Sequence, residues 1–213
     1  MKSWASDAIF GATRRQSLVR AGLAIVLLGS VLWFLPARRP GEEGGHHGAA
    51  APGLDLFEKA GVVELKEGQP APGFTLATLG GGQASAADHR DKLVILNFWA
   101  TWCQPCTLEM PSLEALWSRY RDRGLIVIGV SVDRGAPRAL LEPYVRNLKL
   151  TFPILLDPDS KTSDRWRVTA IPATFLIRPG GDVAGMVTGA REWNSKEMRA
   201  LVERLLPHAR AHR

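Results

Sequence analysis

The sequence predicts an α/β fold in which a central mixed sheet is flanked by helices. Two uncharged runs, Leu93–Ala100 and Leu125–Val132, are rich in apolar, β-forming residues, as in strands that are buried on both faces. Between them, apolar residues recur at helical spacing from Leu108 to Trp117, and Gly124 ends the pattern. A strand, a helix and a strand in this order pair in parallel through a right-handed crossover.

Shorter patterns extend this unit at both ends. Phe74–Leu79, the glycines at 80–82 and a polar return predict an N-terminal hairpin. Scattered apolar residues in Leu54–Leu65 leave both a strand and a helix open. After the unit, the pattern predicts a helix at 138–148, a short strand at 152–156 and a polar helix at 160–167. A two-stranded hairpin at 173–177 and 183–187 and a closing helix at 195–206 follow.

The only two cysteines, Cys103 and Cys106, lie where the first strand turns into the helix. In the first helical turn, unpaired backbone N–H groups and the positive end of the helix dipole favour a thiolate. A lowered thiol pKa and a second sulfur within bonding reach are the requirements of disulfide exchange. A structural zinc site would need further ligands at metal spacing. The pair therefore predicts a redox-active disulfide without a metal or other cofactor.

The net charge of +6 does not indicate a nucleic-acid-binding domain. Residues 1–40 contain six basic residues and one acidic residue, so they carry five of the six net positive charges. A nucleic-acid interface needs basic residues that cluster on the folded domain, and the remaining residues lack that excess.

Residues 18–37 are predicted to form a transmembrane anchor. No residue from Ala21 to Ala37 is charged, and the segment lies at the short end of the roughly 20 residues that span a bilayer. A cleaved signal peptide is the alternative, although no Ala-x-Ala pattern follows the run. Four basic residues precede the run and two follow it. This balance predicts a single-pass protein of the cytoplasmic membrane, with its domain on the periplasmic or extracytoplasmic side.

The remaining segments follow from composition. Residues 1–17 are polar and basic, and they form the predicted cytoplasmic N-terminal segment. Residues 38–67 are the predicted linker and lead-in, because 38–53 are rich in Pro, Gly and Ala without a hydrophobic period. The folded domain is predicted at 68–207, followed by a polar tail at 208–213.

The run NFWATWCQPCTLEMP, the strand–helix–strand unit around it and the later IPATF at 171–175 resemble the thioredoxin superfamily. Within it, they resemble the membrane-tethered TlpA/ResA-type thiol-disulfide oxidoreductases. The resemblance covers roughly Gly68–Leu206 and includes the leading segment 69–74. It implies a thioredoxin-like fold with an N-terminal hairpin and a central insert before Pro172.

The resemblance also implies roles for single residues. Cys103 would be the exposed nucleophile and Cys106 the buried resolving thiol, which agrees with their order along the helix. Ile171–Pro172 matches the place where the family has a cis-proline facing the disulfide. Trp102, Pro105 and Ile171 are the candidate substrate-binding residues, and an ordinary exposed aromatic is the alternative for Trp102.

Glu109 matches the family's acidic residue one helical turn beyond Cys106. It would carry protons for the resolving thiol, unless it is a solvated residue on the helix face. Thioredoxins carry a buried Asp under the active site, where this chain has Asn97. An amide cannot take a proton, so Glu109 is the remaining acid near the motif.

The resemblance implies an extracytoplasmic reductase of disulfides in client proteins, for example in cytochrome c or copper-site maturation. A thiol-transporting membrane protein would supply its electrons. The alternative is a copper metallochaperone, which needs a His ligand near the cysteines, and His89, His208 and His212 lie in unpromising segments. A peroxidase would need a cysteine outside the Cys-x-x-Cys motif, and the chain has none. The pair Gln104-Pro105 between the cysteines leaves the direction of electron flow open.

Overall fold

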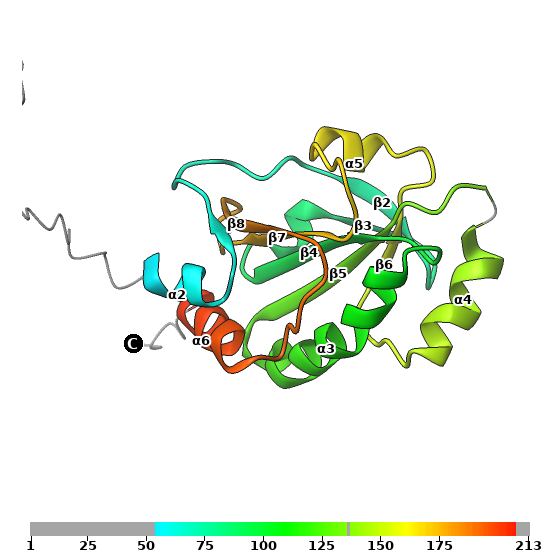
Figure 1. Cartoon of the computed structure of the whole chain (residues 1–213). Helices are drawn as coiled ribbons and strands as arrows, with labels where there is room; N and C mark the ends of the chain where they lie inside the picture. The colour runs from blue at the N-terminus through cyan, green and yellow to red at the C-terminus, as the bar shows by residue number, and fades with distance from the viewer. Residues whose placement is uncertain (1–53, 136, 208–213) are drawn as a thin grey trace, which may run out of the picture. The chain divides into compact units, whose positions relative to one another are not determined.

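The computed structural model describes residues 54–135 and 137–207 (Figure 1). The predicted N-terminal segment 1–17, the anchor 18–37, the first part of the linker and the tail 208–213 lie outside the described residues. Among the residues described, no helix is both long and apolar enough to span a bilayer.

One sheet of eight strands runs through the domain, in the order β1-β8-β7-β4-β5-β6-β2-β3. Its centre is mixed, because β4 pairs in parallel with β5 and antiparallel with β7, while β5 pairs in parallel with β6. Antiparallel strands complete both edges. The strands are β1 (Val63–Glu64), β2 (Thr75–Thr78), β3 (Gln83–Ser85), β4 (Leu93–Trp99), β5 (Leu125–Ser131), β6 (Ile154–Leu156), β7 (Ala173–Ile177) and β8 (Val183–Thr188).

The helices are distributed unevenly over the two faces of the sheet. Figure 1 shows α2, α3 and α6 together on one side and the short α5 on the other. The described helices are α2 (Leu54–Lys59), α3 (Gln104–Tyr120), α4 (Pro137–Asn147), α5 (Lys161–Arg165) and α6 (Lys196–Leu205), with the 3₁₀ turns η1 (Ala86–His89) and η2 (Arg121–Arg123).

The predicted elements of the sheet are confirmed. The apolar runs form β4 and β5 in parallel, α3 connects them, and Gly124 ends the helical segment in the left-handed region at φ 93°. The N-terminal hairpin is β2–β3, and α4, β6 and α5 make up the insert between β5 and β7. The chain therefore has a thioredoxin-like fold, a mixed sheet flanked by helices.

The lead-in, for which the sequence leaves a strand and a helix open, forms both, as α2 and β1. The strand β1 extends the sheet beside β8, where Glu64 pairs with Gly185. A Cβ atom at Gly185 would lie 2.7 Å from Cγ1 of Val62 and 2.8 Å from the carbonyl oxygen of Val63. Only glycine therefore allows this close approach of the two backbones.

The alternation of side chains along β4 divides the apolar residues into two cores. Leu93, Ile95 and Trp99 belong to the core shared with α3 and α6. The side chains between them, such as Val94 and Leu96, belong to the core on the opposite face. Asn97 lies two residues from both Ile95 and Trp99, so its side chain is on the same face of the strand as theirs. The strand therefore presents a polar amide to the side of α3.

Candidate active site

The two cysteines form a disulfide at the start of α3. Cys103 is the N-cap residue, and its Sγ accepts a hydrogen bond of 3.3 Å from the backbone N of Cys106. Cys103 retains 5% of its accessible surface and Cys106 none. The order of exposure is the predicted one, although Cys103 itself is almost covered in the disulfide form.

A buried carboxylate fixes the turn that leads into Cys103. Asp133, which is 2% exposed and directly follows β5 and Val132, accepts hydrogen bonds from the backbone N of Thr101 at 3.0 Å and from Thr101 Oγ1 at 2.7 Å. Ser131 Oγ donates to the same carboxylate at 2.8 Å. Sequence reasoning missed Asp133. The sequence signal for Asp133 is an acidic residue directly after a buried strand, β5. That strand pairs with β4, which precedes the Cys-x-x-Cys motif.

The insert also contacts the first turn of α3. The hydroxyl of Tyr144, from α4, lies 2.7 Å from Thr107 Oγ1, and Thr107 Oγ1 donates to the carbonyl oxygen of Cys103 at 3.2 Å. Thr107 has one hydroxyl proton, so Tyr144 is the donor in their contact. The Tyr144 ring stacks on Trp99 with ring centres 5.1 Å apart. Burial raises the pKa of Tyr144, which keeps this donor protonated.

Glu109 is buried at 2% exposure, one turn beyond Cys106, which rules out the alternative of a solvated residue on the helix face. Its Oε1 accepts a hydrogen bond of 2.8 Å from Asn97 Nδ2. Its Oε2 accepts from Trp193 Nε1 at 2.9 Å and from the backbone N of Arg191 at 3.3 Å. Burial raises the pKa of Glu109, although these three donors act in the opposite direction. The site therefore contains an acid that can hold a proton more readily than a surface glutamate.

Asn97 lies fully buried beneath α3 and links Glu109 to the neighbouring strand. Its amide nitrogen also donates to Thr174 Oγ1 in β7 at 2.8 Å. Its Oδ1 has no hydrogen-bond partner among the described residues. A buried acceptor without a partner is uncommon and marks this position as more than a packing site.

The loop between β8 and α6 supplies contacts that sequence reasoning missed. Trp193 is fully buried there, and its backbone N donates to Ser112 Oγ at 3.0 Å, next to the bond from its indole to Glu109. The Arg191 guanidinium donates to the carbonyl oxygen of Ala60 at 2.6 Å and so connects the lead-in to this loop. A tryptophan in an otherwise polar loop was the available signal.

The predicted substrate-binding residues differ in exposure. Trp102 is 71% exposed, Pro105 is exposed and Ile171 is half-buried. The Ile171–Pro172 bond is cis, as the family resemblance implies, and Pro172 is buried directly before β7. Leu108, which the helical pattern assigned to the apolar face of α3, is 72% exposed. The roles of these residues towards a substrate remain predictions.

The described residues contain no group of three or more His, Cys, Asp or Glu side chains that could hold a metal ion. His89 lines a cavity together with Val94 and Ile128, whose side chains belong to the core on the face opposite the cysteines. It is therefore not placed to share a metal with Cys103 and Cys106. His208 and His212 lie outside the described residues.

Comparison with known proteins agrees with this site. The model of the AhpC/TSA family matches residues 67–186. The chain is 38% identical to the thiol-disulfide oxidoreductase ResA of Geobacillus kaustophilus over 122 residues, which is 57% of this chain and 69% of ResA. It is 35% identical to Bacillus subtilis ResA over 130 residues, covering 61% of this chain and 72% of that protein.

A solved structure shows the same architecture. The crystal structure of a thiol:disulfide interchange protein of the thioredoxin family from Chlorobium tepidum matches with a TM-score of 0.57 and 27% identity. The match covers 66% of this chain and 98% of that one. The family model matches more than half of the chain, and the ResA relatives and the solved structure agree with it. The chain therefore belongs to the AhpC/TSA family and is a thiol-disulfide oxidoreductase of the ResA type.

Proposed function

We propose that this protein reduces disulfides in client proteins on the extracytoplasmic side of the membrane, to which residues 18–37 anchor it. Disulfides of cytochrome c or of copper-site proteins before maturation are the clients that the family resemblance suggests. The observation that carries the proposal is the buried Glu109, one turn beyond Cys106 and hydrogen-bonded to Asn97. A proton acceptor at this position suits a cysteine pair in which Cys103 attacks the client disulfide and Cys106 must then lose its proton to attack Cys103.

In the proposed reaction, the Cys103 thiolate attacks one sulfur of the client disulfide, and the other client sulfur leaves as a thiolate. Cys106 then gives its proton to the Glu109 carboxylate and attacks Cys103 Sγ. This second step forms the Cys103–Cys106 disulfide and releases the second client thiolate. Two electrons pass from the pair to the client, and a thiol-transporting membrane protein returns them to the pair.

The geometry supports the order of the two attacks. Cys103 is the N-cap residue and retains 5% of its surface, whereas Cys106 has none. The exposed Trp102 and Pro105 flank Cys103 along the chain, and an extended client segment would lie over them. Thr101, held by Asp133, keeps the preceding turn in place during the exchange.

Trapping of clients tests this proposal. Cys106→Ser should accumulate mixed disulfides with client proteins, because no thiol remains to resolve them, and Cys103→Ser should trap nothing. The redox potential of the pair tests the direction. A value near −270 mV, as in thioredoxin, supports a reductant, and one near −120 mV, as in DsbA, makes the protein an oxidant instead. Trapping by Cys103→Ser would reverse the two roles.

A further inference from the structure

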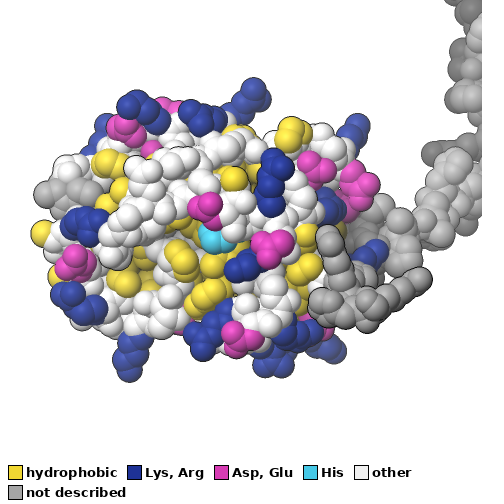
Figure 2. All heavy atoms as spheres, turned by 180° about the vertical axis from the view of Figure 1, so that it is seen from behind, with side chains coloured by type: hydrophobic (Ala, Val, Ile, Leu, Met, Phe, Trp, Pro, Cys, Tyr) yellow, Lys and Arg dark blue, Asp and Glu magenta, His cyan; other side chains and the backbone are white. Residues whose placement is uncertain are grey.

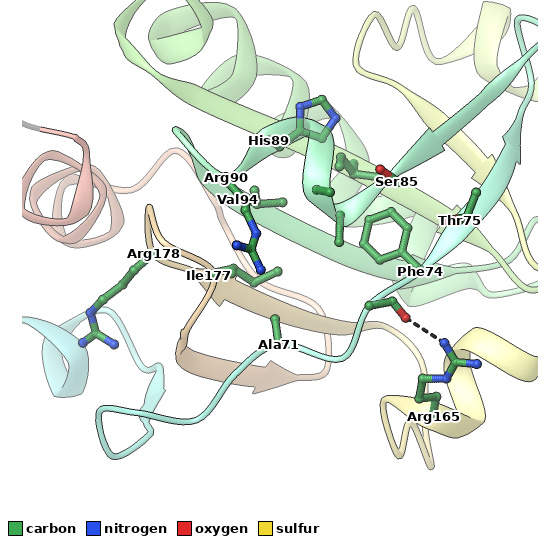
Figure 3. Close-up of a pocket in the computed structure, with 15 residues that line it drawn as sticks. Ala71, Phe74, Thr75, Ser85, His89, Arg90, Val94, Arg165, Ile177 and Arg178 are labelled. Carbon is green, nitrogen blue, oxygen red and sulfur yellow. Dashed lines mark hydrogen bonds between the residues drawn. The ribbon is translucent and has the colours of Figure 1, made fainter.

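A cavity of about 590 Å³ lies on the face of the sheet opposite the redox pair (Figure 3). Its floor consists of the buried apolar side chains Val94 of β4, Ile128 of β5 and Ile177 of β7, with Phe74 beside them. Figure 2 shows this side of the molecule, with apolar side chains exposed in a hollow next to a histidine. His89 is the only histidine among the described residues, so the hollow is this cavity.

The cavity exists because little covers this half of the sheet. Figure 1 shows the helices α2, α3 and α6 on the other face and the short α5 on this one. Of the described residues, those that line the cavity besides the strands come from η1, Arg90, α5 and the segments next to β2 and β8. Several of the residues that these segments contribute to the walls are small, among them Ala71, Gly73, Ala86 and Ala87. Small side chains above a bulky apolar floor leave a space within the usual size of ligand sites.

The rim of the cavity is basic. His89, Arg90, Arg165 and Arg178 line it, and among the described residues the lining contains no acid, although Asp88 and Asp91 lie near His89. Arg165 donates to the carbonyl oxygen of Gly73 at 2.9 Å. The Arg178 guanidinium points away from the cavity in Figure 3, and its Nη2 lies 4.0 Å from Oε1 of Glu64. Two of the three arginines thus have partners within the domain.

Arg90 differs from the other two. Its side chain has no hydrogen bond or ion pair in the described part of the chain. Figure 3 shows its guanidinium beside Val94 and Ile177, over the apolar floor. The buried Nδ1 of the neighbouring His89 also has no hydrogen-bond partner there. Burial lowers the pKa of His89, so at neutral pH its imidazole is neutral and can donate or accept.

We propose that this cavity binds a small amphipathic carboxylate, with its apolar body on Val94, Ile128 and Ile177 and its carboxylate paired with Arg90. A guanidinium recognises a carboxylate through two parallel hydrogen bonds, and His89 offers a further polar atom at the rim. The apolar floor favours an alkyl chain or a ring over a fully polar anion such as phosphate. The site is separate from the redox pair, and its occupation does not require the disulfide chemistry.

Titration calorimetry with octanoate tests the site, using the full chain in lipid nanodiscs and empty nanodiscs as the blank. Octanamide has the same chain without the charge and measures the apolar part alone. We expect one octanoate per chain, bound more tightly than octanamide. We also expect slower hydrogen–deuterium exchange in peptides that cover 69–75 and 85–92. Absence of saturable octanoate binding, or equal affinities for the two compounds, would overturn the proposal.

Variants locate the binding. Arg90→Gln should weaken octanoate binding about tenfold or more and leave octanamide unchanged, whereas Arg204→Gln, an exposed arginine of α6, should change neither. Ala71→Phe should fill the cavity and abolish binding of both compounds. If Ala71→Phe fails to fold, the comparison of Arg90→Gln with Arg204→Gln still decides. Equal effects of Arg90→Gln and Arg204→Gln on octanoate binding would show that octanoate binds elsewhere. Arg90→Gln should not affect the trapping of client proteins by Cys106→Ser.

Discussion

Asn97, in the central strand, donates a hydrogen bond of 2.8 Å from Nδ2 to Oε1 of Glu109, on the helix that covers that strand. Both side chains are buried, at 0% and 2% exposure. At the strand position that resembles the buried acid of thioredoxins this chain has the amide Asn97, and the buried acid of the site is Glu109 on the helix. This pair is therefore the part of the site in which proton transfer can be tested most directly.

Glu109→Gln should slow the resolution step about tenfold or more at neutral pH, because the amide cannot accept the proton of Cys106. Rapid-mixing measurement of client release from the mixed disulfide follows this step. In the wild type, the rate should rise with pH as Glu109 ionises, and in Glu109→Gln that rise should be absent.

Trp193→Phe is the matched control, because it disturbs the same network and keeps the carboxylate. The Trp193 indole lowers the pKa of Glu109 through its hydrogen bond, so its loss should move the rise in rate to higher pH. If Glu109 has only a structural role, both variants should slow the resolution step by the same factor at every pH.

The stability of the oxidised protein should also depend on Glu109. Burial raises its folded-state pKa above the ordinary 4.5, so the folded state binds this proton more tightly than the unfolded chain. The resulting stabilisation is fully present below about pH 4.5 and is lost as pH rises through the raised pKa. Glu109→Gln has no such proton.

Denaturant unfolding between pH 4 and pH 8 measures this difference. The free energy of unfolding of the wild type should fall relative to Glu109→Gln as pH rises, by about 1.4 kcal/mol for each unit by which the pKa is raised. The amide will carry a constant cost, because both carboxylate oxygens accept N–H donors and an NH₂ group must face one of them. Parallel stability curves would mean that the Glu109 pKa is unperturbed.

Much of this site follows from local sequence patterns. The two apolar runs and the helical period between them predict β4, α3 and β5, and the spacing of Cys103 and Cys106 places one at the N-cap and the other inside the first turn. These features depend on residues close in sequence, whose periodicity is set by backbone geometry alone.

The missed residues depend on tertiary packing. Trp193 reaches Glu109 across a separation of 84 residues, and Asp133 reaches Thr101 across 32. No local period relates such pairs, since the segments that carry them come together only in the folded domain. Leu108 shows the converse. Its spacing suggested the apolar face of α3, but Cys106, Glu109 and Met110 on the same turns are buried. Leu108 therefore lies on the outward face of the helix, at 72% exposure.

The predicted anchor can be tested by fractionation. The uncharged run Ala21–Ala37 should keep the full-length protein in the membrane fraction after carbonate extraction. Protease added from outside should reach the folded domain, because the basic residues before the run favour a cytoplasmic N-terminus. A control chain that begins at Gly53 should be recovered in the supernatant. A processed exported form that begins after Leu35 would instead identify the segment as a cleaved signal peptide.

Asp133 should act as a positioning residue for the nucleophile. Asp133→Ala removes the acceptor for the backbone N–H and the hydroxyl of Thr101, two residues before Cys103. An N–H left unsatisfied in this partly buried turn should cost about 1–3 kcal/mol of unfolding free energy. The looser turn should also change the rate at which iodoacetamide alkylates Cys103 in the reduced protein.

Asp133→Asn should restore part of both properties, because its amide oxygen can still accept from the Thr101 backbone while its NH₂ faces a hydroxyl that can rotate. Asp122→Ala removes a carboxylate whose side chain is 90% exposed and should leave both measurements unchanged. A rescue of stability without a rescue of alkylation rate would limit Asp133 to a structural role. If Asp133→Ala behaves like Asp122→Ala, the hydrogen bonds to Thr101 do not hold the turn.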